Sequence, residues 1–263
     1  MKNKKNIRFS LMLFSKKFIK FNKLNHCFFS KKNGFSSGVY SSLNCGYGSN
    51  DRSENIRKNI EYVSRKIKIK SKDLVLMNQT HSNNVALVTK KNQSELRFKS
   101  DALVTDLVNV GIGVLTADCV PILLYDEVNQ VIACIHAGWK GAFSNIINKT
   151  INKINLLNPK NRITAAVGPC IGKNNYEVQT DFYKKFLHHS SFNEKFFFHK
   201  NMKIYFDIRK YVNYKLNLAG IENIDNINED TFENSKSFFS YRRSQKAREA
   251  DYGRCISTIC LKT

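Results

Sequence analysis

The chain has 263 residues, enough for one large domain or two small ones with a sizeable core. Its 43 Lys and Arg residues outnumber its 21 Asp and Glu residues, so the formal net charge is +22. No run of about 18 apolar residues occurs, which argues against a membrane-spanning helix. The seven Cys residues lack tight spacing, which argues against a disulfide scaffold or a zinc finger. We therefore predict a cytoplasmic protein without a membrane partner.

The positive charge raises one non-enzymatic hypothesis, a basic nucleic-acid-binding protein. The lysines, however, are spread along the chain and do not form one stripe interleaved with aromatic residues. The chain is also rich in Lys, Asn and Ile, the residues that AT-rich codons supply. A solvated basic surface with no specific nucleic-acid partner is the preferred interpretation.

The chain begins with a basic segment that lacks acidic residues. Its short apolar patch, Phe9 to Phe14, is interrupted by Ser10 and followed by lysines, and no small-residue cleavage site is present. We interpret residues 1–20 as a flexible basic extension. Because no internal repeat and no Pro- or Gly-rich linker follows, residues 21–263 are predicted to form a single catalytic domain, and we expect a monomer.

Short apolar runs predict most of the strands, and they are concentrated in the middle of the chain. These runs are Leu74–Met77, Val85–Thr89, Ala102–Thr105, Gly113–Thr116, Ile122–Tyr125, Val131–His136, Ile163–Val167 and Cys255–Leu261.

Helices are predicted mainly after these strands. Apolar residues share one helical face at Phe143, Ile146, Ile147, Ile151 and Ile154. A second helix begins after Asp207, a good N-cap, and ends before Gly220, a good C-cap residue. Residues 51–66 and 180–188 are further candidates. The pattern predicts an α/β (α+β) domain of mixed β-sheets covered by helices.

Three residues at the ends of strand-like runs form a candidate metal site: His81, Cys119 and His136. Two neutral imidazoles and one thiolate suit Zn²⁺, and three protein ligands leave a fourth position for water, as in catalytic zinc sites. The spacing is far wider than in zinc fingers, and a lone His or Cys is often a packed core residue. A Cys–His hydrolase with Cys119 as nucleophile uses the same residues and remains an alternative.

Several further motifs resemble one protein family and occur in its order. They are Phe28 to Asn44, Asn78 to Ser82, Ala102 to Asp126, Val131 to Gly141, Val167 to Gly172, Tyr176 to Val178, Phe238 to Arg243 and Gly253-Arg254. The chain thus resembles the YfiH-like family, whose members are named multicopper polyphenol oxidases or laccases, purine nucleoside phosphorylases, and peptidoglycan-editing factors. The resemblance covers most of the chain and implies the family's fold over residues 21–263.

The resemblance implies that His81, Cys119 and His136 are zinc ligands and catalytic residues, which agrees with the donor chemistry. Asp118 is a further catalytic candidate because it could orient a ligand or a water, although it could equally bond loop amides. Copper is second to zinc as the cofactor, because a multicopper site needs more histidines than the six present.

Four residues are predicted to bind substrate: Asn44, Lys31, Arg242 and Arg243. The adjacent arginines supply the planar donors that a phosphate co-substrate needs, although a surface pair or structural salt bridge is the alternative. Lys31 and Lys140 stand where many family members carry Arg, and Asp230 stands where a Cys is usual. At Lys31 this leaves a point charge in place of a bidentate donor.

The function implied is a zinc-dependent purine nucleoside phosphorylase that acts on adenosine or inosine with phosphate, with adenosine deamination as a second activity. A peptidoglycan-precursor editing hydrolase is the alternative within the family.

Overall fold

Two mixed β-sheets organise the computed structural model, which describes residues 12–94 and 97–263. The first sheet has the order β1 (Met12–Leu13), β2 (Leu24–Phe29), β15 (Cys255–Leu261), β7 (Gly111–Thr116), β3 (Leu74–Met77), β5 (Arg97–Phe98). The second has the order β14 (Asn223–Asn226), β10 (Ile163–Val167), β8 (Val120–Asp126), β9 (Val131–Ala137), β6 (Ala102–Thr105), β4 (Val85–Leu87). Both sheets combine parallel and antiparallel pairs, which confirms the predicted fold class.

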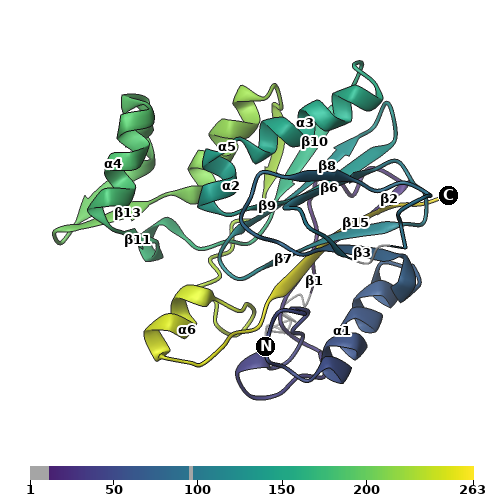
Figure 1. Ribbon diagram of the computed structural model, residues 1–263, viewed down its shortest axis with the longest axis horizontal. Helices are drawn as coiled ribbons and strands as arrows, with labels where there is room; N and C mark the ends of the chain where they lie inside the picture. Colours follow the sequence, from purple (N-terminus) through teal and green to yellow (C-terminus); the bar gives the residue numbers. More distant parts are fainter. Residues whose placement is uncertain (1–11, 95–96) are drawn as a thin grey trace, which may run out of the picture.

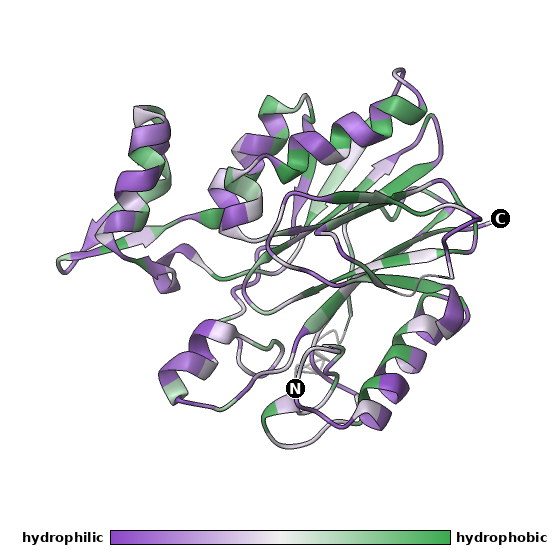
Figure 2. Cartoon of the chain, viewed as in Figure 1, coloured by the Kyte–Doolittle hydropathy of each residue, from purple (hydrophilic) through white to green (hydrophobic). Residues whose placement is uncertain are grey.

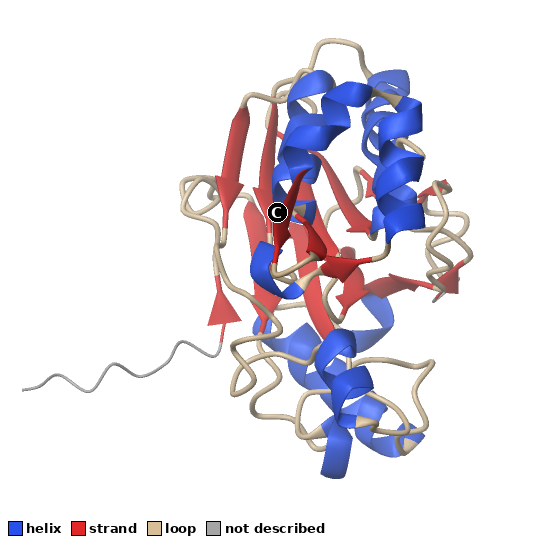
Figure 3. Ribbon diagram, turned by 90° about the vertical axis from the view of Figure 1, so that its left-hand side faces the viewer, coloured by secondary structure: helices blue, strands red, loops and turns tan. Residues whose placement is uncertain are grey.

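The sheets lie face to face, with helices outside both of them (Figure 1 and Figure 3). Side chains such as Ile112 and Leu123 from the two sheets share one buried cluster between the layers. The outer face of the second sheet is covered by α2 (Trp139–Phe143), α3 (Ile146–Leu157) and α5 (Ile208–Leu218). The outer face of the first sheet packs against α1 (Ser53–Lys66). Because both faces of each sheet are covered, the central strands are mostly apolar (Figure 2), with a few buried polar residues such as Ser257 and Thr258 of β15.

All eight predicted strands are present, with ends that differ by at most two residues. The helix after Asp207 is confirmed as α5, and the Asp207 side chain accepts a hydrogen bond from the Lys210 amide. The periodicity around residues 143–154 belongs to two helices, α2 and α3. They are separated at Asn145, whose φ of 64° lies in the left-handed region that Asn tolerates.

A smaller lobe stands out from the sheets on one side (Figure 1). It contains a three-stranded sheet in the order β11 (Glu177–Val178), β13 (Lys203–Phe206), β12 (Phe197–Lys200), together with α4 (Thr180–His189). Its core is aromatic: Phe182 stacks on Phe186 with ring centroids 4.9 Å apart. The remaining elements are α6 (Tyr241–Ala247) and the short 3-10 helices η1 (Gly38–Tyr40), η2 (Ser71–Asp73), η3 (Lys173–Asn175) and η4 (Ser191–Phe196).

The boundary expected for the N-terminal extension is wrong for residues 12–20, because this segment is part of the fold. β1 pairs with β2, and Phe18 is fully buried in the core between the sheets. The Ser15 amide donates a hydrogen bond of 2.7 Å to Nε2 of the buried His26. The lysines at positions 16, 17, 20 and 23 interrupt the apolar pattern, so the sequence gives little indication of this packing. The rest of the expected extension, residues 1–11, lies outside the described residues.

None of the helices in the described ranges is both long and apolar enough to cross a membrane.

Candidate metal centre and its cavity

The three predicted metal ligands meet at one end of the second sheet. His81 lies in the loop after β3, Cys119 in the tight turn between β7 and β8, and His136 within β9. The antiparallel register of β8 and β9 pairs Pro121 with His136 and Val120 with Ala137. This register places the turn that carries Cys119 beside His136.

The ligand atoms of His81, Cys119 and His136 all lie within 4.8 Å of one another. Cys119 Sγ is 3.8 Å from His81 Nε2. Bonds of about 2.0 and 2.3 Å at a tetrahedral angle would separate a nitrogen and a sulfur ligand by about 3.5 Å. Cys119 and His81 therefore have nearly the spacing that a zinc ion requires.

Gly138 leaves the space that this group needs. A Cβ at this position would lie 2.9 Å from His81 Cδ2 and 3.2 Å from Cys119 Sγ. Any larger residue would push both ligands away from their positions.

Asp101 holds the centre together, although its role was not predicted from the sequence. Its Oδ1 lies 2.8 Å from His136 Nδ1, which leaves Nε2 of that ring for a metal. The main-chain amides of Thr80, His81 and Ser82 also donate to this carboxylate at 3.2, 3.0 and 2.7 Å. These bonds fix His81, whose φ of 57° is in the left-handed region, in an otherwise costly conformation.

Asp101 leaves only a weak signal in the sequence. It directly precedes the strand β6, whose register pairs Ala102 with Ile135, next to His136. This neighbourhood becomes visible only when the strand pairing is known.

The electrostatics of the centre favour a thiolate. Burial alone would raise the pKa of Cys119, but the charge and hydrogen bonds of His136, with those of His81, lower it to about 6. Burial would lower the pKa of His136, but the Cys119 thiolate and Asp101 raise it to about 9. For Asp101, burial opposes ionisation, but the bonds from His136 and Ser82 outweigh it and hold the pKa below its usual range. A metal ligand must be a thiolate, so this arrangement prepares Cys119 for binding.

Asp118 is turned toward the loops below the centre, and both of its oxygens are occupied. Oδ1 accepts from the Thr231 hydroxyl at 2.7 Å, and Oδ2 accepts from the Ser240 hydroxyl and the Arg242 amide at 2.9 and 2.7 Å. This is the loop-bonding arrangement that was the alternative to a catalytic role. The carboxylate anchors the start of α6 beside Cys119.

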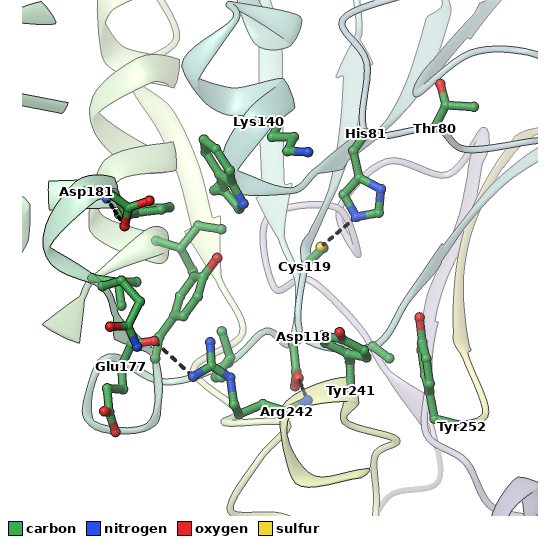
Figure 4. Close-up of a pocket in the computed structure, with 18 residues that line it drawn as sticks. Thr80, His81, Asp118, Cys119, Lys140, Glu177, Asp181, Tyr241, Arg242 and Tyr252 are labelled. Carbon is green, nitrogen blue, oxygen red and sulfur yellow. Dashed lines mark hydrogen bonds between the residues drawn. The ribbon is translucent and has the colours of Figure 1, made fainter. Parts of the chain in front are cut away.

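The centre opens into a cavity of about 730 Å³, within the range of small-molecule sites of about 300–1,000 Å³. Figure 4 shows His81 and Cys119 on one side, Glu177 and Asp181 of the lobe on another, and Arg242, Tyr241 and Tyr252 below. The lining residues are Thr80, His81, Ala117, Asp118, Cys119, Trp139, Lys140, Ile171, Tyr176, Glu177, Val178, Gln179, Asp181, Phe182, Ile208, Tyr241, Arg242 and Tyr252.

The two predicted phosphate-binding arginines have different surroundings. Arg242 lines the cavity, and its Nη1 donates to the main-chain oxygen of Glu177 at 2.9 Å. Arg243 instead donates to the main-chain oxygens of Thr231, Phe232 and Phe238, at 2.6–2.8 Å, and is absent from the cavity lining. The sequence motif does not distinguish them, because α6 was not predicted and the two arginines point in different directions from it.

Lys31 and Asn44 do not line the cavity either. The Asn44 side chain is fully buried, and its oxygen accepts from the amides of Gly46 and Arg254 at 3.0 and 2.9 Å. Lys31 Nζ lies 5.4 Å from the centre of the Phe239 ring. Asn44 therefore bonds to the loops at residues 46 and 254, and neither it nor Lys31 is in the cavity that the predicted ligands line.

The sequence of the chain matches those of known proteins. The sequence model of the family described as multi-copper polyphenol oxidoreductase laccase matches residues 25–262. A purine nucleoside phosphorylase of Rickettsia conorii is 36% identical over 196 residues, which cover 73% of this chain and 80% of the relative. The purine nucleoside phosphorylase YfiH of Escherichia coli is 28% identical over 235 residues, covering 89% and 93%.

Solved structures of similar proteins share the fold. The crystal structure of the hypothetical protein YfiH of Bacillus licheniformis superimposes with a TM-score of 0.85 at 28% identity, covering 92% of this chain and 94% of that one. Protein NMB0706 of Neisseria meningitidis gives a TM-score of 0.82 at 26% identity, covering 96% and 100%.

Proposed function

The chain belongs to the YfiH-like family, described as multi-copper polyphenol oxidoreductase laccase, and we propose that it is a zinc-dependent purine nucleoside phosphorylase. The observation that carries this proposal is one cavity that joins a His–Cys–His ligand group to the guanidinium of Arg242. An anion site beside a metal centre in one cavity can hold a phosphate next to a bound nucleoside. The phosphorylases of Rickettsia and Escherichia coli named above support it at the family level.

Zinc is the metal that the donor set favours, with His81, Cys119 and His136 as its ligands. Across the described residues this is the one group of three that could hold an ion, whereas a multicopper centre needs several such groups. Two neutral imidazoles and one thiolate leave a zinc ion Lewis-acidic, and the ion would supply electrophilic stabilisation of negative charge in the cavity.

Phosphate is proposed to bind at Arg242. Among the described residues, its guanidinium makes one hydrogen bond, to Glu177, and a guanidinium has five N–H donors. The remaining donors can hold a phosphate in the planar, two-point geometry that arginine offers. Lys140, which also lines the cavity, adds a second positive charge.

The purine is proposed to lie against the aromatic residues of the cavity. Trp139 and Phe182 meet edge to face with centroids 4.8 Å apart, and both line it. Trp139 packs against the Phe182 ring, and its indole offers a face on which the base would stack.

Two rival reactions use the same residues. The lowered pKa of Cys119 beside two histidines is also what a cysteine nucleophile requires. Three protein ligands leave a fourth position of a bound zinc ion for water, which is what zinc-dependent deamination of adenosine requires.

The deciding experiment is an assay of free base from inosine and adenosine, with and without phosphate, on metal-loaded and chelator-stripped protein. We expect base release that needs both phosphate and zinc, and recovery when zinc is restored. Phosphate-independent ammonia release would identify deamination. Full activity in metal-free protein would favour the cysteine nucleophile, and no turnover of any nucleoside would refute the proposal.

A further inference from the structure

Tyr176 lies in the cavity without an assigned role. It follows η3 directly and precedes β11, and its main-chain oxygen accepts a hydrogen bond of 3.0 Å from the Phe206 amide. Its side chain lines the same cavity as Cys119 and Arg242.

The ring of Tyr176 is held from several sides. Phe206 meets it edge to face with centroids 5.8 Å apart, and the Phe182 ring is 6.4 Å away. The Arg242 guanidinium carbon lies 5.4 Å from its centre. These contacts restrict where the hydroxyl can point, so it is preorganised at little entropic cost.

The Tyr176 hydroxyl has no hydrogen-bond partner within the described part of the chain. The hydroxyls of Tyr40 and Tyr183, by contrast, bond to Asp251 at 2.8 Å and to Glu194 at 3.3 Å. Tyr176 is half-buried and lines the cavity, so a hydroxyl there without a partner among the described residues is suited to a ligand, which would replace water at this oxygen.

This hydroxyl keeps its proton. Burial raises the pKa of Tyr176 above its usual range, the negative charges of Cys119 and Asp118 act in the same direction, and the charge of Arg242 opposes them. Tyr176 is therefore a neutral donor at physiological pH.

Resting on the proposed phosphorolysis, we propose that Tyr176 donates a hydrogen bond to the purine base as it leaves the sugar. A phosphate oxygen forms a bond to C1′ while the C1′–N9 bond breaks, and its electron pair moves into the purine ring. The proton that the free base finally carries comes from monohydrogen phosphate, so the reaction is balanced without another reactant. A fixed donor at the acceptor edge of the base stabilises the charge that develops there.

The test compares two nucleosides that differ in their need for such a donor. The base of inosine leaves as an anion unless a donor assists it. The base of 7-methylinosine carries a fixed positive charge, so it leaves as a neutral molecule without a donor. Loss of one preorganised donor costs about 10²-fold to 10³-fold in kcat. Tyr176→Phe should therefore lower kcat on inosine by about 100-fold and on 7-methylinosine by less than about threefold.

Tyr183→Phe is the matched control, because Tyr183 lies in the same lobe but outside the cavity lining. It should leave both reactions within about twofold of the wild type, as expected for removing one exposed hydrogen bond. Circular dichroism and zinc content should be unchanged in both variants. An equal loss on the two substrates in Tyr176→Phe would assign the residue a packing role and overturn the proposal.

Equilibrium binding of hypoxanthine separates this proposal from the proposed function. Tyr176→Phe should weaken binding about tenfold, the value of one hydrogen bond of about 1.4 kcal/mol, while Tyr183→Phe should not. If wild-type protein turned over no nucleoside but bound hypoxanthine with this difference, phosphorolysis would be refuted and the contact retained. Equal hypoxanthine affinity in wild type and Tyr176→Phe would refute the contact itself.

Discussion

The two walls of the cavity are built in different ways. The metal wall, formed by His81, Cys119 and His136, is braced by short hydrogen bonds to the buried Asp101 and by the pairing of β8 with β9. The lobe wall is formed by Tyr176 and Phe182. These residues lie on short elements that are held together by contacts between aromatic rings. The metal wall is thus part of the main core, and the lobe wall is attached to it. Metal retention and ligand binding should therefore respond to different substitutions.

The largest effect is expected from the metal wall. His81→Ala or Cys119→Ala removes one of three ligands, so zinc content should fall from about one per chain to below about 0.1, with activity reduced at least about 100-fold. Elemental analysis and the phosphorolysis assay measure the two quantities.

His199→Ala is the control, because this exposed histidine of β12 is not in the ligand group. It should keep both zinc and activity. Normal zinc content in His81→Ala would contradict the ligand assignment.

Asp101→Asn tests whether the metal wall depends on its brace. An amide cannot match the carboxylate bond to His136 Nδ1, and loss of such a supporting partner typically weakens metal binding about 10–100-fold. Competition with a chelator would measure this, and activity should return when zinc is in excess. An activity loss that excess zinc does not restore would mean that Asp101 acts on something other than the metal.

The grouping of His81, Cys119 and His136 was predictable from the sequence because their strands are apolar runs and the three residues lie at the ends of those runs. Their imidazole and thiolate side chains are also typical ligands of Zn²⁺. Asp101 was missed because its role depends on how β6 pairs with β9, which no local pattern records.

The lobe wall and α6 were harder to predict. The strand β12 and its neighbours are short and rich in Lys and Phe, so their alternation is weak. Arg242 and Arg243 are adjacent in sequence, and only the helix geometry of α6 separates a cavity residue from a structural one. The packed segment at 12–20 was missed for a similar reason, since its lysines mask the buried Phe18.

The arginine pair belongs to α6, and Arg242 joins this helix to the lobe through the Glu177 main-chain oxygen. Arg242→Ala should raise KM for phosphate about tenfold or more, the effect of losing a charge-assisted hydrogen bond, with zinc content unchanged. A loss of zinc in this variant would show that the two walls are not independent.

Arg243→Ala should act on stability instead. It leaves three main-chain oxygens without their donors, so the free energy of unfolding should fall by about 3 kcal/mol and Tm by about 8 °C. KM for phosphate should stay within about twofold of the wild type, since a residue outside the cavity makes no ligand contact. A change in KM as large as that of Arg242→Ala would return Arg243 to the substrate site.

The smallest effect is a pH dependence confined to the metal wall. Because the pKa of Cys119 is lowered to about 6, its thiolate is present above that pH and is lost as the pH falls through it. Iodoacetamide reacts with thiolates, so in chelator-stripped protein the labelling rate of Cys119 should rise around pH 6 and level off well before pH 9. Restoring zinc should suppress labelling, since a coordinated thiolate is shielded.

The other six cysteines are buried and provide internal references in the same peptide map. In Asp101→Asn the loss of the carboxylate lowers the pKa of His136, which weakens the positive charge that stabilises the thiolate. The Cys119 labelling profile should then move to higher pH. Labelling that continued to rise through pH 9 in the stripped wild type would show that the thiolate is not prepared in advance. Rapid labelling in fully active, metal-free protein would instead make Cys119 the nucleophile.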